Sequence, residues 1–147
     1  MSAKLGVDAG LARIGVALSQ GSLCLPIETL ANTAGAAAEI LQIANSRLAS
    51  VIYVGLPLGL SGNQTASSKM AIALARNLQA LTPLPVRMVD ERLTTKSAQA
   101  KFREAGKNTK ESKPGIDAAS AAMILEFALQ SEREGLLAGK SLEELDA

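Results

Sequence analysis

Histidine is absent from the 147-residue chain. Without it, the chain can form neither a Ser-His-Asp triad nor a Cys-His pair, and it cannot bind zinc through imidazole. We therefore expect an enzyme of this composition to use carboxylates for its chemistry. Paired carboxylates select hard cations such as magnesium or manganese, since these ions prefer oxygen ligands.

Cysteine and aromatic residues are scarce as well. Cys24 is the only cysteine, so no intramolecular disulfide can form, which fits a reducing cytosol. The only aromatic residues, Tyr53, Phe102 and Phe127, leave the core to aliphatic side chains and disfavour base stacking on aromatic platforms. No apolar run approaches the ~20 residues that cross a bilayer, and no signal peptide precedes the first expected strand. We therefore expect a cytoplasmic protein with no membrane partner.

Charges of the two signs nearly balance, with a formal net charge of +1. Their distribution along the chain is uneven. From Arg87 to Lys113 there are eight basic and four acidic residues, whereas from Glu132 to Ala147 there are two basic and five acidic residues. A polyanion is therefore expected to bind the first of these segments rather than the tail.

The opening stretch, residues 4–19, predicts two short strands joined by a turn, because apolar residues alternate with small ones in its second half. Asp8 lies between the two apolar runs, and Gly6 and Gly10 beside it leave the backbone bare. A carboxylate that emerges there can hold a cation or meet a phosphate. The alternative is that Asp8 belongs to an ordinary turn, in which Asp and Gly are common.

The rest of the chain alternates helices and strands, which predicts an α/β fold with one antiparallel strand in the sheet. Further strands are expected at residues 23–30, 49–55 and 86–89, and helices at residues 33–48 (capped by Thr33), 64–81, 96–105 and 117–132. We expect one domain over residues 1–147, with a mobile loop at residues 107–115 and a loosely held acidic tail from about 132 to 147.

Acidic residues stand at the expected carboxyl ends of the parallel strands, where function gathers in open α/β sheets. Asp8 ends the first strand, Asp90 and Glu91 end the fifth, and Asp117 opens the last helix. Asp117 could serve only as a helix cap, and Glu91 could form a surface ion pair with Arg92. Three acids at one sheet edge repel one another unless a cation lies between them, so their combination favours a metal site.

Five segments of the chain form a recognisable set: Gly6-Val7-Asp8-Ala9-Gly10, Arg13-Ile14-Gly15-Val16-Ala17, Val54-Gly55-Leu56-Pro57, Val89-Asp90-Glu91-Arg92-Leu93-Thr94-Thr95, and Ile116-Asp117 followed by Ala121-Ala122. Together they resemble the YqgF/RuvX family of bacterial nucleases, which are related to Holliday-junction resolvases. The match runs in order from about Lys4 to Leu129, and its most specific part is the Asp-Glu-Arg-Leu-Thr-Thr block. Leu11 and Gln20 depart from the Thr and Asp that the family commonly has there.

The resemblance implies a ribonuclease H-like mixed five-stranded sheet, with the second strand antiparallel and helices on both faces. It also implies a metal-dependent phosphodiesterase in which Asp8, Glu91 and Asp117 hold two magnesium or manganese ions. One ion would activate water and the other would stabilise the leaving oxygen. A contribution of Asp90 to this site is left open.

The same resemblance implies that basic residues position the nucleic acid by its phosphates, without reading its sequence. The residues expected to do so are Arg13, Arg92, Lys107, Lys110 and Lys113. The implied role is maturation of the 5′ end of pre-16S ribosomal RNA, with resolution of branched DNA as the alternative. The chain could form a homodimer.

Two other classes of function stay open. An RNA-binding assembly factor with structural acids would bind nucleic acid without cleaving it under any metal. A nucleotide-binding fragment of the actin-like or sugar-kinase type would bind ATP instead, although such kinases need a second domain to close over the nucleotide.

Overall fold

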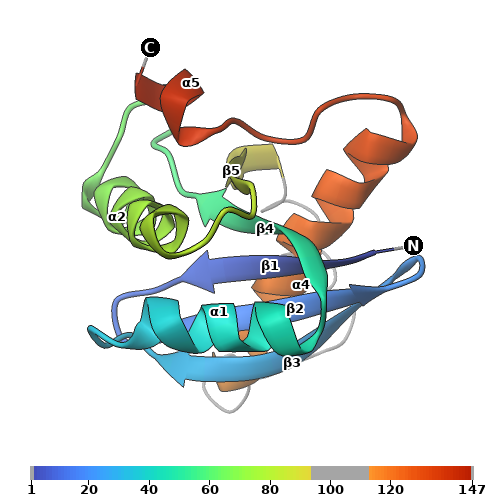
Figure 1. Ribbon diagram of the computed structural model, residues 1–147. Helices are drawn as coiled ribbons and strands as arrows, with labels where there is room; N and C mark the ends of the chain where they lie inside the picture. The colour runs from blue at the N-terminus through green and yellow to red at the C-terminus, as the bar shows by residue number, and fades with distance from the viewer. Residues whose placement is uncertain (1, 94–112, 147) are drawn as a thin grey trace.

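A five-stranded sheet forms the centre of the computed structural model, which describes residues 2–93 and 113–146, with side chains from residue 118 onward in the second range. The strand order is β3-β2-β1-β4-β5 (Figure 1). β1 and β2 are antiparallel, as are β2 and β3, whereas β1, β4 and β5 are parallel. The predicted mixed sheet with an antiparallel second strand is therefore confirmed. The strands are β1 (Ala3–Ala9), β2 (Arg13–Gln20), β3 (Leu23–Ala31), β4 (Ala49–Leu56) and β5 (Val86–Asp90).

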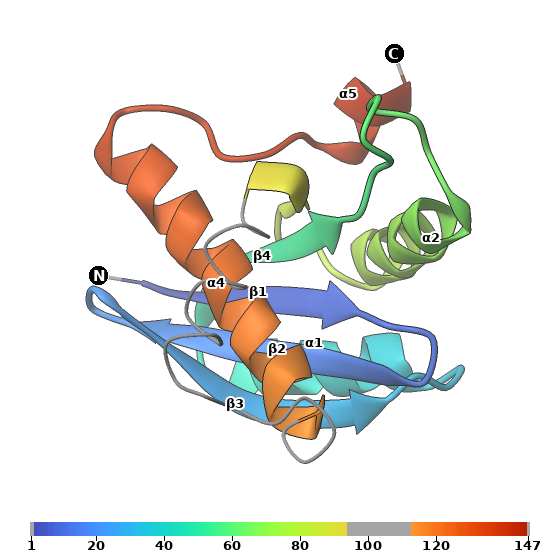
Figure 2. The ribbon, with the colours of Figure 1, turned by 180° about the vertical axis from the view of Figure 1, so that it is seen from behind.

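Helices cover both faces of the sheet. α1 (Ala36–Ser46) and α2 (Ala66–Leu81) lie on one face, and α4 (Lys113–Arg133) crosses the other, as the view from behind in Figure 2 shows. In the described parts of the chain, no helix combines the length and apolar character needed to span a membrane.

The alternation of side chains along β1 sorts its residues between these two faces. Leu5 and Val7 are fully buried in the core that α1 and α2 cover. Gly6 faces α4 so closely that a Cβ atom on it would lie 2.6 Å from the main-chain oxygen of Ala121. Asp8, two residues further along the strand, therefore emerges on the α4 face.

The starts of two helices differ from our expectations. Thr33 is not the cap of α1, because the helix begins at Ala36 after Gly35, with no side-chain cap. α4 begins at Lys113, so Lys113 to Gly115 belong to the helix rather than to a loop, and Asp117 lies inside its first turns rather than at its start. Proline is compatible with a first helical turn, where its missing N–H would have no partner in any case. The helix expected at residues 96–105 and the loop residues 107–112 lie outside the described residues.

The C-terminal segment, expected to be loosely held, has defined contacts with β5. Met88 and Lys140 exchange two main-chain hydrogen bonds of 2.7 and 2.8 Å. The guanidinium of Arg87 donates to the carbonyl oxygens of Ala138 and Gly139 at 2.6 and 2.7 Å. These contacts cover part of the edge of β5, which would otherwise present unpaired main-chain groups. The short helix α5 (Leu142–Asp146) follows, and Arg76 forms an ion pair with Asp146 at 2.6 Å.

Candidate active site

Asp8 is the second-last residue of β1, at the edge of the sheet where the parallel strands end. It pairs with Gly15 of β2, and its neighbour Val7 is in register with Val54 of β4. Asp8 therefore lies between a glycine of β2 and Gly55 of β4. The absence of bulky side chains on both sides leaves its carboxylate room on the α4 face.

Glu91 follows β5 directly and reaches across β4 toward Asp8. Its main-chain N–H donates to the carbonyl oxygen of Leu56 at 3.0 Å, which extends the parallel β4–β5 pairing to this residue. Its carboxyl group lies over Gly55, where a Cβ atom would be 2.6 Å from Glu91 Oε1 and 2.5 Å from Ile124 Cδ1. Gly55 therefore provides the space in which Glu91 meets α4 and Asp8.

The two acids are in contact, and the contact changes the protonation of Glu91. Burial of the side chain raises the pKa of Glu91, and so do a hydrogen bond to Asp8 and the negative charges of Asp8 and Asp90, which together bring it to about 9. Near neutral pH, Glu91 is thus protonated in the metal-free protein and donates to the Asp8 carboxylate. Such a pair is held together by one proton in place of a cation.

This protonation makes the stability of the metal-free protein depend on pH. The folded chain keeps the Glu91 proton up to about pH 9, whereas the unfolded chain releases it near the ordinary value of 4.5. Between these values the folded state binds more protons, so the free energy of unfolding is expected to fall as pH rises through this window. Urea unfolding in EDTA across this range measures the slope, and Glu91→Gln should flatten it. Equal slopes for the two proteins would contradict the shared proton.

The contribution of Asp90 to the site was left open. In the structure its carboxylate forms an ion pair with Arg92. Arg92 Nη2 donates to Asp90 Oδ2 at 2.7 Å, Arg92 Nε lies 3.1 Å from both carboxylate oxygens, and the Arg92 main-chain N–H donates to Oδ1 at 2.9 Å. These bonds from Arg92 lower the pKa of Asp90. The ion pair considered for Glu91 thus forms at Asp90, and Glu91 is left to face Asp8.

The remaining predicted site residues are placed only in part. Arg13 starts β2 at the same sheet edge, where its carbonyl oxygen accepts from the N–H of Gly10 at 2.8 Å. The side chains of Asp117 and Lys113 lie outside the described part of the chain, as do Lys107 and Lys110 entirely. No group of three acidic or cysteine side chains that could hold a metal occurs among the residues whose side chains are described. The third acid of the site therefore stays a prediction.

Gly55 was not among the predicted site residues, although it lies beside one of them. It ends the strand expected at residues 49–55, and the structure shows that its missing side chain makes room for Glu91. The signal in the sequence was a glycine at the carboxyl end of a β-branched run, where a side chain would ordinarily add packing.

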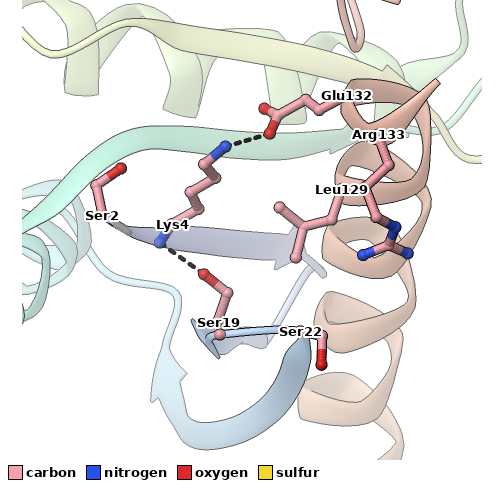
Figure 3. A pocket seen from close by; sticks show the side chains of 8 residues that line it. Ser2, Lys4, Ser19, Ser22, Leu129, Glu132 and Arg133 are labelled. Atoms are coloured by element: carbon pink, nitrogen blue, oxygen red, sulfur yellow. Dashed lines mark hydrogen bonds and ion pairs between the residues drawn. The ribbon is translucent and has the colours of Figure 1, made fainter. Parts of the chain in front are cut away.

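A separate cavity of about 410 Å³ lies at the opposite end of β1 and α4 (Figure 3). Lys4 Nζ and the hydroxyl of Tyr53 both donate to the carboxylate of Glu132, and the Lys4 main-chain N–H donates to Ser19 Oγ at 2.8 Å. Neither Asp8 nor Glu91 lines this cavity. Its polar groups attach the end of α4 to the sheet, away from the paired acids.

The sequence of the chain is similar to those of known proteins. Residues 2–131 match the family model described as "RuvX: Holliday junction resolvase". A protein of Leifsonia xyli subsp. xyli, named "Putative pre-16S rRNA nuclease", is 46% identical over 134 residues, covering 88% of this chain and 86% of the relative. A protein of Clavibacter michiganensis with the same name is 43% identical over 138 residues, covering 90% and 86%.

Solved structures with the same fold are much more distant in sequence. RuvC of T. thermophilus in complex with a Holliday-junction substrate aligns over 95% of this chain and 99% of its own, with a TM-score of 0.66 and 14% identity. A second Thermus thermophilus RuvC structure aligns over the same shares with a TM-score of 0.58 and 16% identity. These matches confirm the ribonuclease H-like fold that the resemblance implied.

Proposed function

The chain belongs to the RuvX family, and on that premise we propose that it is a nuclease that hydrolyses phosphodiester bonds in the 5′-end maturation of pre-16S ribosomal RNA. The observation that carries the proposal is the contact between Asp8 and Glu91 at the carboxyl edge of the sheet. Two acids in contact destabilise each other once both are charged, so the deprotonated pair calls for a cation between the two carboxylates. The names of the relatives support pre-16S rRNA as the substrate. The protein would encounter such an rRNA precursor in the cytoplasm.

The donor set at this edge fits a hard divalent cation such as Mg²⁺ or Mn²⁺. Asp8 and Glu91 offer carboxylate oxygens within one site, and Glu91 is buried enough to need a counter-charge once it loses its proton. We propose that Asp117 joins them as the third ligand. When bound, such ions activate water and stabilise the leaving oxygen of a phosphodiester.

The protein's own residues prepare this site in three ways. Glu91 has to release its proton before it can act as a ligand, so binding of the cation and deprotonation are linked. Arg92 holds Asp90 in an ion pair at the rim, which keeps that carboxylate from competing with Glu91. Gly55 leaves the space in which the Glu91 carboxyl lies.

Magnesium is expected to raise the melting temperature of the protein. A ligand that binds only the folded state stabilises that state by about 2.7 kcal/mol when its free concentration is 100 times its Kd. In Asp8→Asn the rise should be much smaller, because the variant lacks one of the carboxylates that would hold the cation. Thermal unfolding with EDTA, Mg²⁺ and Mn²⁺ measures both effects. A wild-type melting temperature that does not respond to either ion would count against the shared site.

The cleavage reaction itself is tested with labelled nucleic acids. Purified protein is incubated with Mg²⁺ or Mn²⁺ and a pre-16S RNA carrying its 5′ leader, a linear duplex or a four-way DNA junction. Cleavage of the leader near the mature 5′ end supports the proposal. Binding without cleavage under either ion would instead identify an RNA-binding assembly factor.

Junction resolution is the second candidate function, because the matching family model carries that description. Symmetrical cleavage of the four-way junction with no cleavage of the RNA would favour it. A resolvase has to cut two strands of one junction, so this outcome would also favour the homodimer, which light scattering on the purified protein tests.

A further inference from the structure

Two leucines stand exposed at the same sheet edge as the paired acids. Leu11 is 87% exposed on the turn between β1 and β2, directly after the strand that carries Asp8. Leu60 is 100% exposed on the loop that follows β4, beyond Gly55. Both leucines thus lie on connections that leave the sheet at the edge where Asp8 and Glu91 meet.

Ordered main-chain contacts hold the turn of Leu11. The N–H of Gly10 donates to the carbonyl oxygen of Arg13, and the side-chain amide of Asn32 donates to the carbonyl oxygen of Gly10 at 2.7 Å. The N–H of Asn32 also donates to the carbonyl oxygen of Ala12 at 3.0 Å. The exposure of Leu11 thus belongs to a fixed turn between paired strands.

The loop of Leu60 is fixed in a similar way. Gly59 N–H donates to the carbonyl oxygen of Asn63 at 2.9 Å, and Gly62 N–H donates to that of Gly59 at 2.8 Å. Arg92, already bound to Asp90, extends Nη1 to the carbonyl oxygen of Leu60 at 3.4 Å. The loop therefore presents its leucine outward while its main chain is tied to the residue that follows Glu91.

An arginine accompanies each leucine, which indicates the chemistry of the partner. Arg13 follows Leu11 by two residues, and the guanidinium of Arg92 lies under the loop of Leu60. A cation beside an exposed aliphatic side chain suits a phosphate next to an apolar base face. A regular duplex keeps its base faces stacked inside and offers only phosphates and sugars to such a surface, whereas unpaired nucleotides offer both.

We propose that Leu11 and Leu60 pack against the faces of unpaired bases on either side of the phosphodiester that is cleaved at the site of Asp8 and Glu91, so that the site selects single-stranded or distorted segments over continuous duplex. The inference rests on the proposed nuclease function. Base contact through aliphatic side chains is consistent with a chain that has no tryptophan and only three other aromatic residues. Apolar side chains placed against base steps in this way are known from proteins that distort nucleic acids.

Binding to three oligomers of equal length tests the inference in the Asp8→Asn protein, which should bind without cleaving. The oligomers are a single-stranded RNA, the same sequence in duplex, and an abasic sugar-phosphate chain. Leu60→Ser and Leu11→Ser should each weaken binding to the single strand by about tenfold, because part of a buried leucine is lost. Binding to the duplex and to the abasic chain should stay unchanged. Leu81→Ser, at the exposed C-terminal end of α2, is the matched control and should change none of the three affinities.

Leu60→Trp gives a second readout, since it introduces the only tryptophan of the chain. Its emission should be quenched by the single strand and not by the abasic chain, while Leu81→Trp should respond to neither. Equal affinity for single strand and duplex, unchanged by both serine substitutions, would overturn this inference and leave the nuclease proposal intact. Failure to bind any of the oligomers that contain bases would overturn both.

Discussion

Asp8→Asn is expected to lower the rate of cleavage by at least about three orders of magnitude while the protein stays folded. Asparagine keeps the volume of the side chain but loses the negative charge that a divalent cation requires. The loss should appear in kcat, because the missing interaction supports the reaction rather than the contact with distant phosphates. Single-turnover cleavage of the labelled substrate, at saturating protein, measures it.

The neighbouring acid Asp90 provides the control for this experiment. Asp90→Asn changes the same charge one residue from Glu91, yet the structure has its carboxylate engaged by Arg92. Its rate is therefore expected to stay within about tenfold of the wild type. A loss as large as that of Asp8→Asn would show that Asp90, rather than Glu91 alone, serves the reaction. Near-wild-type cleavage by Asp8→Asn would overturn the site itself.

The sheet could be predicted from the sequence because its signals are local. Alternation at period 2 predicted β1 and β2, and the continuous run ending at Gly55 predicted a buried parallel strand. The acids Asp8 and Glu91 could likewise be assigned to one edge, because parallel strands end on the same side.

The contact between the two acids could not be derived in the same way. It depends on the absence of a side chain at Gly55, on a different strand from either acid, and on how closely Ile124 of α4 approaches. The partner of Arg92 was also not predictable, since Asp90 and Glu91 are adjacent and only strand geometry decides which of them faces the rim. The contacts of residues 138–140 with β5 involve main-chain groups, and these are the same whatever the side chains, so the sequence gives no sign of them.

The close fit at Gly55 leads to the second large effect that we expect. Gly55→Ala would place a Cβ atom 2.6 Å from Glu91 Oε1 and 2.5 Å from Ile124 Cδ1, both at the ends of side chains that can move. The protein should therefore still fold, with a loss of about 1–3 kcal/mol in the free energy of unfolding. The Glu91 carboxyl, however, has to move away from its position beside Asp8. Displacement of a catalytic group by about 1 Å can cost about 100-fold in rate, and we expect a loss of that size.

Gly6→Ala separates this effect from simple overpacking, because Gly6 lies on the same face of the sheet but contacts the main chain of α4. Its Cβ atom would lie 2.6 Å from the carbonyl oxygen of Ala121, which can give way only if the helix shifts. Gly6→Ala should therefore lose more stability than Gly55→Ala. Urea unfolding and single-turnover cleavage are measured on both proteins, together with the pH dependence of stability in EDTA. In Gly55→Ala the pH dependence of stability should weaken, because Glu91 leaves Asp8. If this variant instead keeps the wild-type pH dependence and the wild-type cleavage rate, the position of Glu91 over Gly55 does not matter for the reaction.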